Sequence, residues 1–503
     1  MKLVYIKIIL LLCYLNLYSA EFPYPIVFIH GLDSHDSTWY STIEQINSIF
    51  ETQFKSENIF HGVLNAYPEM TNLAGVNNKL GDNDDDVLFY FQPKSKNNIF
   101  TINFDNFWNG NPSNPVIYIY PNSSYDVKTG ESKSNQASIV KQGYALSLMM
   151  KKLVNDLGYE KVILFGHSMG GLCAREYLQR NENGKPKWWI NKNDSNGHHV
   201  AKFVTIGTPH FGSNFFSLGK QKNIKDEIQV ANTSSEATRD LRYSYSGGEV
   251  GRYLFGGYED ELNSLPSYLG GWHNRDVNCN GIETDNIEGI NSHINKHPLP
   301  QNIAYHWITS NSSGSGDYIV DLDRQWLKNT SNQIYPVGIT DTTLTNTIHT
   351  KEPNDLKAII RGLDEPSNFD LAYKIYLDKT YIQTVTFLQD YKAMDYDVFW
   401  IDVNGYDLNN KQLEIVYNDK IVKYGLNRKI NVKLFTDDRK LLLDTNFIDS
   451  SKLNTAILNF NIVKLERKKI FIQTKIEAKE NEWSIPINFK LSLNNLNNIK
   501  SEF

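Results

Sequence analysis

The stretch KVILFGHSMGG, Lys161–Gly171, decides the fold. Its apolar run from Val162 to Phe165 is rich in β-branched and aromatic residues, which predicts a strand buried in a parallel sheet. Ser168 follows between Gly166 and Gly170, and GLCAREYLQR after it predicts a helix. A serine on a sharp turn between a buried strand and a helix is typical of a nucleophile elbow, where small neighbours let the strained turn form. Gly-x-Ser-x-Gly also occurs by chance, so the rest of the chain must supply a base, an acid and an oxyanion hole.

From about Pro25 to Leu363, apolar runs alternate with helical patterns. The predicted strands are PIVFI, VLFYF, VIYIY, KVILF, KFVTI and IAYHWIT. Between VIYIY and KVILF, apolar residues recur at helical spacing from Ile139 to Leu157, and Gly158 ends the pattern. This alternation predicts an α/β fold, with a mostly parallel sheet flanked by helices on both faces.

The character of the sequence changes near RGLDEPSNFD. From Leu371 onward the segments are short, alternating and β-rich, and turn signals such as Asn404-Gly405 separate them. The sequence therefore predicts an α/β domain over 21–367 and a C-terminal all-β, sandwich-like domain over 368–503. The β-rich domain is either a structural appendage or a module that attaches to a surface, a substrate or a partner of unknown kind.

Length, charge and the N-terminus narrow the class of protein. The chain has 503 residues, which is too long for one ordinary domain, and its net charge of -6 without a long basic run argues against nucleic-acid binding. MKLVYIKIILLLCYLNLYSA has lysines before an apolar core and small residues at its end, which predicts a signal peptide over 1–20. We expect an exported protein, whether secreted, periplasmic or on the cell surface. Cys173 is expected to pack as a small hydrophobe, with a disulfide to Cys279 as the alternative.

The order of residues along the chain identifies an acid and a base. A serine hydroxyl needs an adjacent base, and that base needs an acid to orient it and to stabilise the imidazolium. After a nucleophile elbow, the acid and then the histidine follow on loops after later strands. Asp317 follows IAYHWIT and a Ser/Gly-rich loop, with Asp321 and Asp323 as rival acids. His349 lies before a helix expected over about 353–361, and it is the only histidine after Asp317.

Backbone N–H groups are expected to form the oxyanion hole. One belongs to Met169, directly after the serine. The other is expected in FIHGL, after the first strand, where Gly31 lets the chain turn close to the site and Leu32 supplies the N–H. His30 is expected to buttress this loop rather than to act as a base.

With these pieces in place, the chain resembles a serine lipase or esterase of the α/β-hydrolase superfamily. VFIHGL, QASIVKQGYALSLMMKKL, GHSMGGLCAREYL and TIGTPHFGS are similar to stretches of secreted bacterial lipases and GPI-anchor inositol-deacylase-like hydrolases, over roughly residues 24–363. The resemblance implies the α/β-hydrolase fold, a Ser168, Asp317 and His349 triad, an acyl-enzyme, and lipid or other carboxylic esters as substrates, with no required cofactor. It also implies a structural role for His210. The chain departs from the family at Tyr318, where glycine is frequent.

A long insertion over 214–300 carries many apolar and aromatic residues, with glycine pairs at 247–248, 256–257 and 270–271. In lipase-like enzymes such an insertion caps the acyl groove and opens at lipid surfaces. The sequence predicts a lid of this kind, with an ordinary packed subdomain as the alternative.

A possible calcium loop lies inside this insertion. In RDVNCNGIETDNIEG, Asp276, Asn278 and Asn280 alternate before a glycine, as in the first half of a calcium loop. The twelfth position, which should hold a bidentate glutamate, is Ile287, and Glu288 comes one residue late. A turn-rich loop without Ca²⁺ is the alternative interpretation.

Two other functions stay open from the sequence. An acyltransferase or a phospholipase would use the same triad, and a binding or adhesion protein would act through the β-rich tail. Labelling of Ser168 by an active-site fluorophosphonate separates the enzymes from the binding protein.

Overall fold

The structure is a computed structural model, and its described residues form two compact units. The α/β unit lies within 24–43 and 60–358, and the β unit lies within 1–23, 44–59 and 359–503. The residues that the structure describes are 20–32, 34–54, 61–65, 88–90, 98–104, 125–126, 131–132, 139–213, 236–241, 289–290, 298–327, 340–385, 394–406, 411–418, 429–448, 455–461, 469–477 and 485–495.

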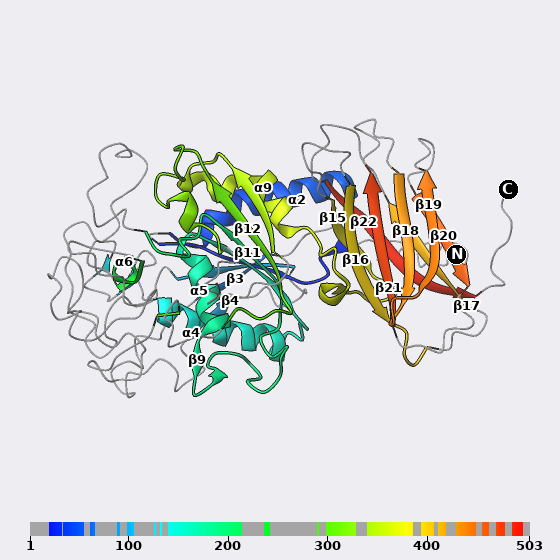
Figure 1. The fold of residues 1–503 in the computed structure, drawn as a ribbon, viewed down its shortest axis with the longest axis horizontal. Helices are drawn as coiled ribbons and strands as arrows, with labels where there is room; N and C mark the ends of the chain where they lie inside the picture. The colour runs from blue at the N-terminus through cyan, green and yellow to red at the C-terminus, as the bar shows by residue number, and fades with distance from the viewer. Residues whose placement is uncertain are drawn as a thin grey trace, which may run out of the picture. The chain divides into compact units, whose positions relative to one another are not determined.

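An eight-stranded sheet forms the centre of the α/β unit (Figure 1), in the order β13-β12-β11-β8-β2-β5-β3-β4. All neighbouring strands run parallel except β3 and β4, which confirms the predicted mostly parallel sheet. The sequence did not predict β3, β5 or β13, and VIYIY lies outside the described residues. The strands are β2 Ile26–Ile29, β3 His61–Asn65, β4 Leu88–Tyr90, β5 Ile99–Asn103, β8 Val162–His167, β11 Val200–Ile206, β12 Ala304–Ser310 and β13 Thr340–Thr345.

The central strand β8 is buried on both faces, as an unbroken apolar run predicts. Leu164 points into a core shared with α4 (Ile139–Lys151) and α5 (Met169–Gln179). Phe165 points to the other face, where Trp39 of the 3-10 turn η1 (Asp36–Trp39) packs on it with ring centroids 5.5 Å apart. Both faces of the sheet are therefore covered, which leaves its ends for a site.

The β unit holds two five-stranded sheets, β1-β15-β22-β17-β20 and β14-β16-β21-β18-β19. Phe399 and Phe489 come from different sheets and pack with ring centroids 4.8 Å apart, so the sheets form a sandwich. This confirms the predicted all-β C-terminal fold, to which the structure adds β19. The strands are β1 Ala20–Glu21, β14 Tyr373–Lys374, β15 Thr380–Val385, β16 Met394–Asp402, β17 Lys411–Asn418, β18 Lys429–Thr436, β19 Leu441–Ile448, β20 Thr455–Asn461, β21 Lys469–Glu477 and β22 Ile485–Asn495.

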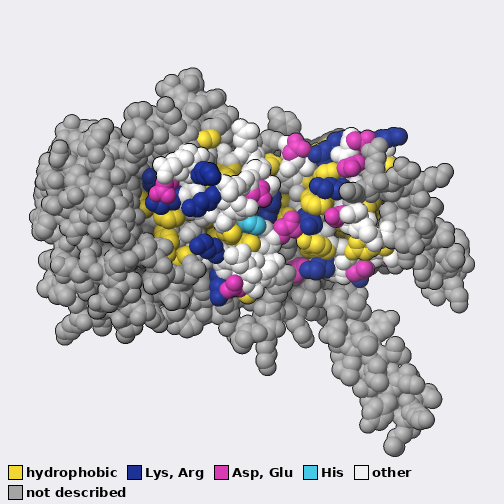
Figure 2. Space-filling view, turned by 90° about the horizontal axis from the view of Figure 1, so that it is seen from below, with side chains coloured by type: hydrophobic (Ala, Val, Ile, Leu, Met, Phe, Trp, Pro, Cys, Tyr) yellow, Lys and Arg dark blue, Asp and Glu magenta, His cyan; other side chains and the backbone are white. Residues whose placement is uncertain are grey.

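The remaining elements are short, apart from α2. They are α2 Tyr40–Phe54, β6 Tyr125–Asp126, β7 Glu131–Ser132, the π turn η3 Lys152–Asp156, β9 Asn181–Glu182, β10 Lys185–Pro186, α6 Glu236–Leu241, η6 Leu322–Arg324, η7 His349–Asn354, α9 Leu356–Leu363 and η8 Phe369–Leu371. Among the described residues, no helix is both long and apolar enough to cross a membrane. On the face drawn in Figure 2, basic and acidic side chains are interspersed.

Little of the predicted lid over 214–300 is described. Ala237 and Leu241 of α6 and Ile290 pack in a small apolar cluster with Met169 and Leu172, beside the start of α5. The calcium-loop residues Asp276, Asn278 and Asn280 lie outside the described residues, as does Cys279. Cys173 is a buried free thiol, in keeping with the predicted packing role.

Candidate active site

Ser168 stands on a strained turn at the end of β8. Its backbone has φ +53° and ψ −130°, a conformation that residues with a side chain rarely adopt. A Cβ on Gly166 would lie 2.4 Å from the nitrogen of Gly171, and one on Gly170 would lie 2.4 Å from the carbonyl oxygen of Ile29. Both positions therefore require glycine, and the strand, turn and helix follow one another as the sequence predicts.

A chain of hydrogen bonds runs from Ser168 to a buried carboxylate. The Ser168 hydroxyl donates to His349 Nε2 at 2.9 Å, and His349 Nδ1 donates to Asp317 Oδ2 at 2.8 Å. Nδ1 carries the proton because it faces the carboxylate, which leaves Nε2 free to accept. The structure thus brings together three residues that the sequence placed 181 and 32 positions apart, in the geometry of a base held between a nucleophile and an acid.

A tight turn aims the Asp317 carboxylate. Its Oδ1 accepts hydrogen bonds from the backbone N–H groups of Ile319 at 2.9 Å and Val320 at 2.7 Å. Tyr318, between them, has φ +79°, the left-handed region that favours glycine, and glycine is frequent here in the lipases that the chain resembles. The rival acids Asp321 and Asp323 are exposed and lie beyond this turn.

The loop after β2 lies directly against the serine. A Cβ on Gly31 would be 2.6 Å from Ser168 Cβ, so only glycine fits there. His30 Nδ1 donates to the Gly31 carbonyl at 3.0 Å, and its Nε2 accepts from the Phe104 N–H at 3.0 Å. Burial lowers the pKa of His30 to about 3, so the ring stays neutral and braces the loop. The oxyanion roles of the Leu32 and Met169 N–H groups stay predictions.

His210 of the TPHFGS stretch is fully buried, and its contacts are with Arg175, Thr205 and Trp307. Arg175 Nη1 donates to the His210 carbonyl at 3.0 Å, and the His210 ring packs edge-on against Trp307. Burial lowers the pKa of His210 well below 6.5, so it is neutral at this packed position. These contacts are those of a residue that holds the end of β11 in place.

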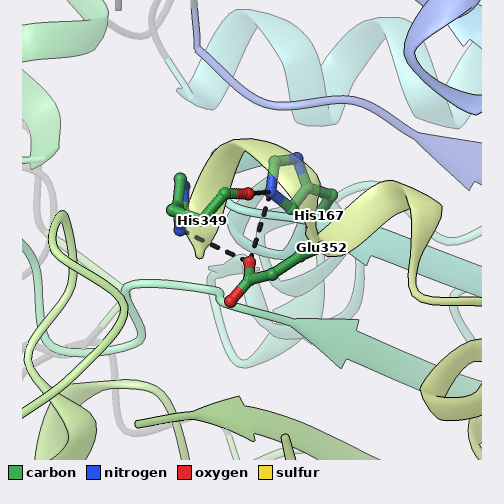
Figure 3. Close-up of side chains that lie close together, drawn as sticks. All are labelled: His167, His349 and Glu352. Carbon is green, nitrogen blue, oxygen red and sulfur yellow. Dashed lines mark hydrogen bonds and ion pairs between the residues drawn. The ribbon is translucent and has the colours of Figure 1, made fainter. Parts of the chain in front are cut away.

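Sequence reasoning missed Glu352, which lies behind His349 (Figure 3). Its side chain is fully buried, and its Oε2 is 3.4 Å from His349 Nδ1 and 3.4 Å from His167 Nε2. His167 Nε2 donates to the His349 carbonyl at 3.0 Å, and burial lowers its pKa well below 6.5. The only available signal was the nearness of two acids to His349 in HTKEPND: Glu352 is three residues on and Asp355 is six, and the sequence does not say which of them packs against the histidine.

Two clusters of described residues have the spacing of metal ligands. His167, His349 and Glu352 present donor atoms within 4.8 Å of one another, and so do Asp364, Glu365 and Asp397 in the β unit. In the first cluster both imidazole N–H groups already donate, one to Asp317 and one to the His349 carbonyl, so a metal would have to displace both protons.

One protein-family model matches part of the chain. Residues 141–233 match the family model described as lecithin:cholesterol acyltransferase, a span that includes Ser168 but not Asp317 or His349. No curated protein matches the chain in sequence.

Several solved structures are remotely similar. The product of the lin2722 gene from Listeria innocua is 13% identical, with 67% of this chain and 91% of that chain covered and a TM-score of 0.34. The mature lipase BlEst2 from Bacillus licheniformis is 15% identical, with 69% and 94% covered and a TM-score of 0.30. Phospholipase PlaB from Legionella pneumophila is 12% identical, with 60% and 45% covered and a TM-score of 0.27. The α/β-hydrolase fold of this chain rests on its own sheet order and serine turn.

Proposed function

We propose that this chain is a serine hydrolase that cleaves carboxylic esters through an acyl-enzyme, with lipids as its substrates. The observation that carries the proposal is the unbroken hydrogen-bonded series Ser168–His349–Asp317, on a serine turn that is strained. The family match over residues 141–233 supports ester chemistry at this serine.

In the first half of the reaction, Ser168 Oγ attacks the ester carbonyl carbon while His349 Nε2 takes its proton. The imidazolium that forms lies against the Asp317 carboxylate, which stabilises it and keeps Nδ1 protonated. His349 then gives the Nε2 proton to the leaving alcohol, and the acyl group stays on Ser168. In the second half, a water molecule attacks the acyl-enzyme with the same histidine as base, and the acid is released.

The negative charge on the carbonyl oxygen needs N–H donors that are already oriented. We propose the N–H groups of Met169, at the start of α5, and of Leu32, in the loop that lies against Ser168. The N-terminal end of a helix adds a favourable dipole at the same point. Each such donor is expected to lower the barrier by about 3 kcal/mol.

Hydrolysis of p-nitrophenyl esters from acetate to palmitate tests the proposal, with the chain from Glu21 onward. Ser168→Ala is expected to reduce kcat by about 10⁶-fold, as removal of a serine nucleophile does. Ser147→Ala is the matched control, because Ser147 is also buried but its hydroxyl donates only to the Tyr144 carbonyl on α4. A Ser168→Ala variant that hydrolyses these esters as fast as the wild type would refute the proposal. The acyl-chain length that the wild type prefers separates a lipase from an esterase.

Acyl transfer is the second candidate, because the matching family model is described as an acyltransferase. Transfer uses the same acyl-enzyme, with an alcohol in place of water. The test is product partition: a phospholipid donor is offered with and without a long-chain or sterol alcohol. Ester product in preference to free fatty acid favours the transferase.

We also propose that the protein acts outside the cytoplasm. The support is the N-terminal pattern of lysines, an apolar core and small residues up to Ala20. N-terminal sequencing of the protein from its native source should begin at Glu21, and a chain that retains residues 1–20 contradicts the idea.

A further inference from the structure

A second buried carboxyl group lies behind His349, in addition to Asp317. Glu352 belongs to the same 3-10 turn as His349, and none of its side chain is exposed. Its Oε2 lies 3.4 Å from His349 Nδ1, the nitrogen that donates to Asp317 (Figure 3). The base of the site therefore has a carboxyl group on two sides of one N–H group.

Hydrogen bonds decide which of the two carboxyls carries the negative charge. Asp317 accepts from two backbone N–H groups and from His349, and such donors favour the ionised form. Neither oxygen of Glu352 has a donor in hydrogen-bonding geometry within the described part of the chain. Burial and the neighbouring Asp317 carboxylate raise the pKa of Glu352 well above 4.5. Asp317 is thus the anion, and Glu352 is the neutral acid.

The surroundings of Glu352 agree with this assignment. His167 is neutral and donates its Nε2 proton to the His349 carbonyl, so it brings no positive charge. Asp355, the next acidic group, accepts from the hydroxyls of Thr345 and Thr347 and adds a further negative charge. Among the described residues, the basic side chains within 4 Å of the Glu352 carboxyl are these two histidines, and no lysine or arginine lies that close.

Packing holds the Glu352 carboxyl in place. A Cβ on Gly207, which has φ +57°, would lie 1.9 Å from Glu352 Oε2. The carboxyl therefore lies directly against the backbone just after β11, with none of its surface exposed. A shift of a few tenths of an ångström toward His349 would give it the ordinary N–H···O distance of about 2.9 Å.

We propose that Asp317 and Glu352 form a carboxyl pair that shares one proton behind His349, with Glu352 as a positioning residue and reserve acid. This inference rests on the proposed function. At rest the proton stays bonded to Glu352 and points at Asp317 in a hydrogen bond. Only one negative charge, that of Asp317, then faces His349. Two buried anions would hold the imidazole protonated, and a protonated ring cannot accept the Ser168 proton. In Asp317→Asn no neighbouring carboxylate holds the proton on Glu352, so Glu352 releases it to solvent and the Glu352 carboxylate accepts the His349 Nδ1–H.

A double-mutant cycle tests the pair, with the best p-nitrophenyl ester as substrate. Loss of a lone triad acid costs about 10⁴-fold in kcat, whereas Asp317→Asn is expected to cost about 100-fold or less because Glu352 takes over. Glu352→Gln is expected to cost less than about tenfold in the wild-type background and more than about a hundredfold in the Asp317→Asn background. Asp321→Asn is the matched control, since Asp321 is an exposed acid on the same loop and should add no loss to Asp317→Asn.

The pH profile gives a readout that a purely structural glutamate would not move. In Asp317→Asn, both His349 and Glu352 must be deprotonated, so the acid limb of kcat/KM should acquire a second ionisation. Adding Glu352→Gln should remove it. The proposal is wrong if Asp317→Asn alone loses about 10⁴-fold and keeps a single ionisation, an outcome that can be read even where the double variant does not fold.

Stability tests the pair without activity, and so separates its failure from that of the proposed function. Above pH 4.5 the unfolded Glu352 ionises while the folded one keeps its proton, so the Tm advantage of Glu352→Gln over wild type should grow as pH rises. In the Asp317→Asn background this growth should shrink, because the charge that holds the proton is gone. An advantage that follows the same pH course in both backgrounds would overturn the pair, whether or not the wild type cleaves esters.

Discussion

Gly31 leaves no room for a methyl group beside the nucleophile. A Cβ there would lie 2.6 Å from Ser168 Cβ and 3.1 Å from Ser168 Oγ. The same loop is braced by neutral His30, through its bonds to the Gly31 carbonyl and the Phe104 N–H. At the scale of the residue, then, the position of the serine hydroxyl depends on atoms that take no part in proton transfer.

Gly31→Ala is therefore expected to lower kcat with a smaller effect on Tm. The serine or the loop must move by several tenths of an ångström, and a displacement near 1 Å can cost about 10²-fold in rate. Gly184→Ala, in the β9–β10 turn, is the control for kcat: a Cβ there meets nothing within 4 Å, so the strain from its φ of +78° can lower Tm but does not reach the serine. Ester-hydrolysis kinetics for both variants provide the measurement. Equal kcat values for Gly31→Ala and wild type would show that the close approach does not position Ser168.

At the scale of the element, a central strand and an edge strand of the sheet differ in what they bury. Leu164 on β8 is fully buried between the sheet and its helices, whereas Leu344 on the edge strand β13 is 62% exposed. The strand that carries the serine turn is thus buried along its whole length. A nucleophile on a strained turn needs such a rigid support, because the strain has to be offset by packing elsewhere.

Leucine-to-alanine substitutions measure this difference. Leu164→Ala is expected to lower the free energy of unfolding by about 2–5 kcal/mol, since it removes buried methyl groups and leaves a cavity. Leu344→Ala on the same sheet is expected to change it by less than about 0.5 kcal/mol, as exposed positions usually do. Denaturant unfolding curves give both values. Similar losses at the two positions would mean that the edge strand is covered.

At the scale of the whole molecule, the α/β unit contains several histidines that are buried and neutral. Burial lowers the pKa of His30 and His198 to about 3, and lowers that of His167 and His210 well below 6.5. In the unfolded chain each of them takes up a proton below about pH 6.5. Their contribution to stability is therefore complete above pH 6.5, and it is lost as the pH falls toward 3.

Acid is accordingly expected to destabilise the protein well before its ordinary carboxylates titrate. Each such histidine can remove up to about 1.4 kcal/mol of stability per pH unit below 6.5. Protonated Glu352 has the opposite effect, because its contribution to the free energy of unfolding rises as the pH falls. The four buried histidines together outweigh this single group. Tm should fall steadily between pH 6.5 and 5 in scans at fixed ionic strength. A Tm that stays constant over this range would contradict the neutral state of these histidines.

The serine turn, the fold class and the order of the site residues could be predicted because their signals are local or follow chain order. KVILFGHSMGG encodes strand, turn and helix in one contiguous stretch, and His349 is the only histidine after Asp317. The polar strands β3 (HGVLN) and β13 (TDTTLT) were missed, because neither is an apolar run and pairing in the sheet, rather than composition, makes them strands.

The sequence by itself determined that a buried strand delivers a serine to a turn flanked by glycines, since backbone sterics and hydrophobic burial act on neighbouring residues. Only the tertiary structure decided that Asp317 and not Asp321 or Asp323 meets His349, and that Glu352 lies behind the same ring. Burial of one acid among several depends on where its turn packs. The Glu352 carboxyl packs against the backbone of Gly207. Gly207 is 145 residues away in the chain and is brought close by the parallel sheet.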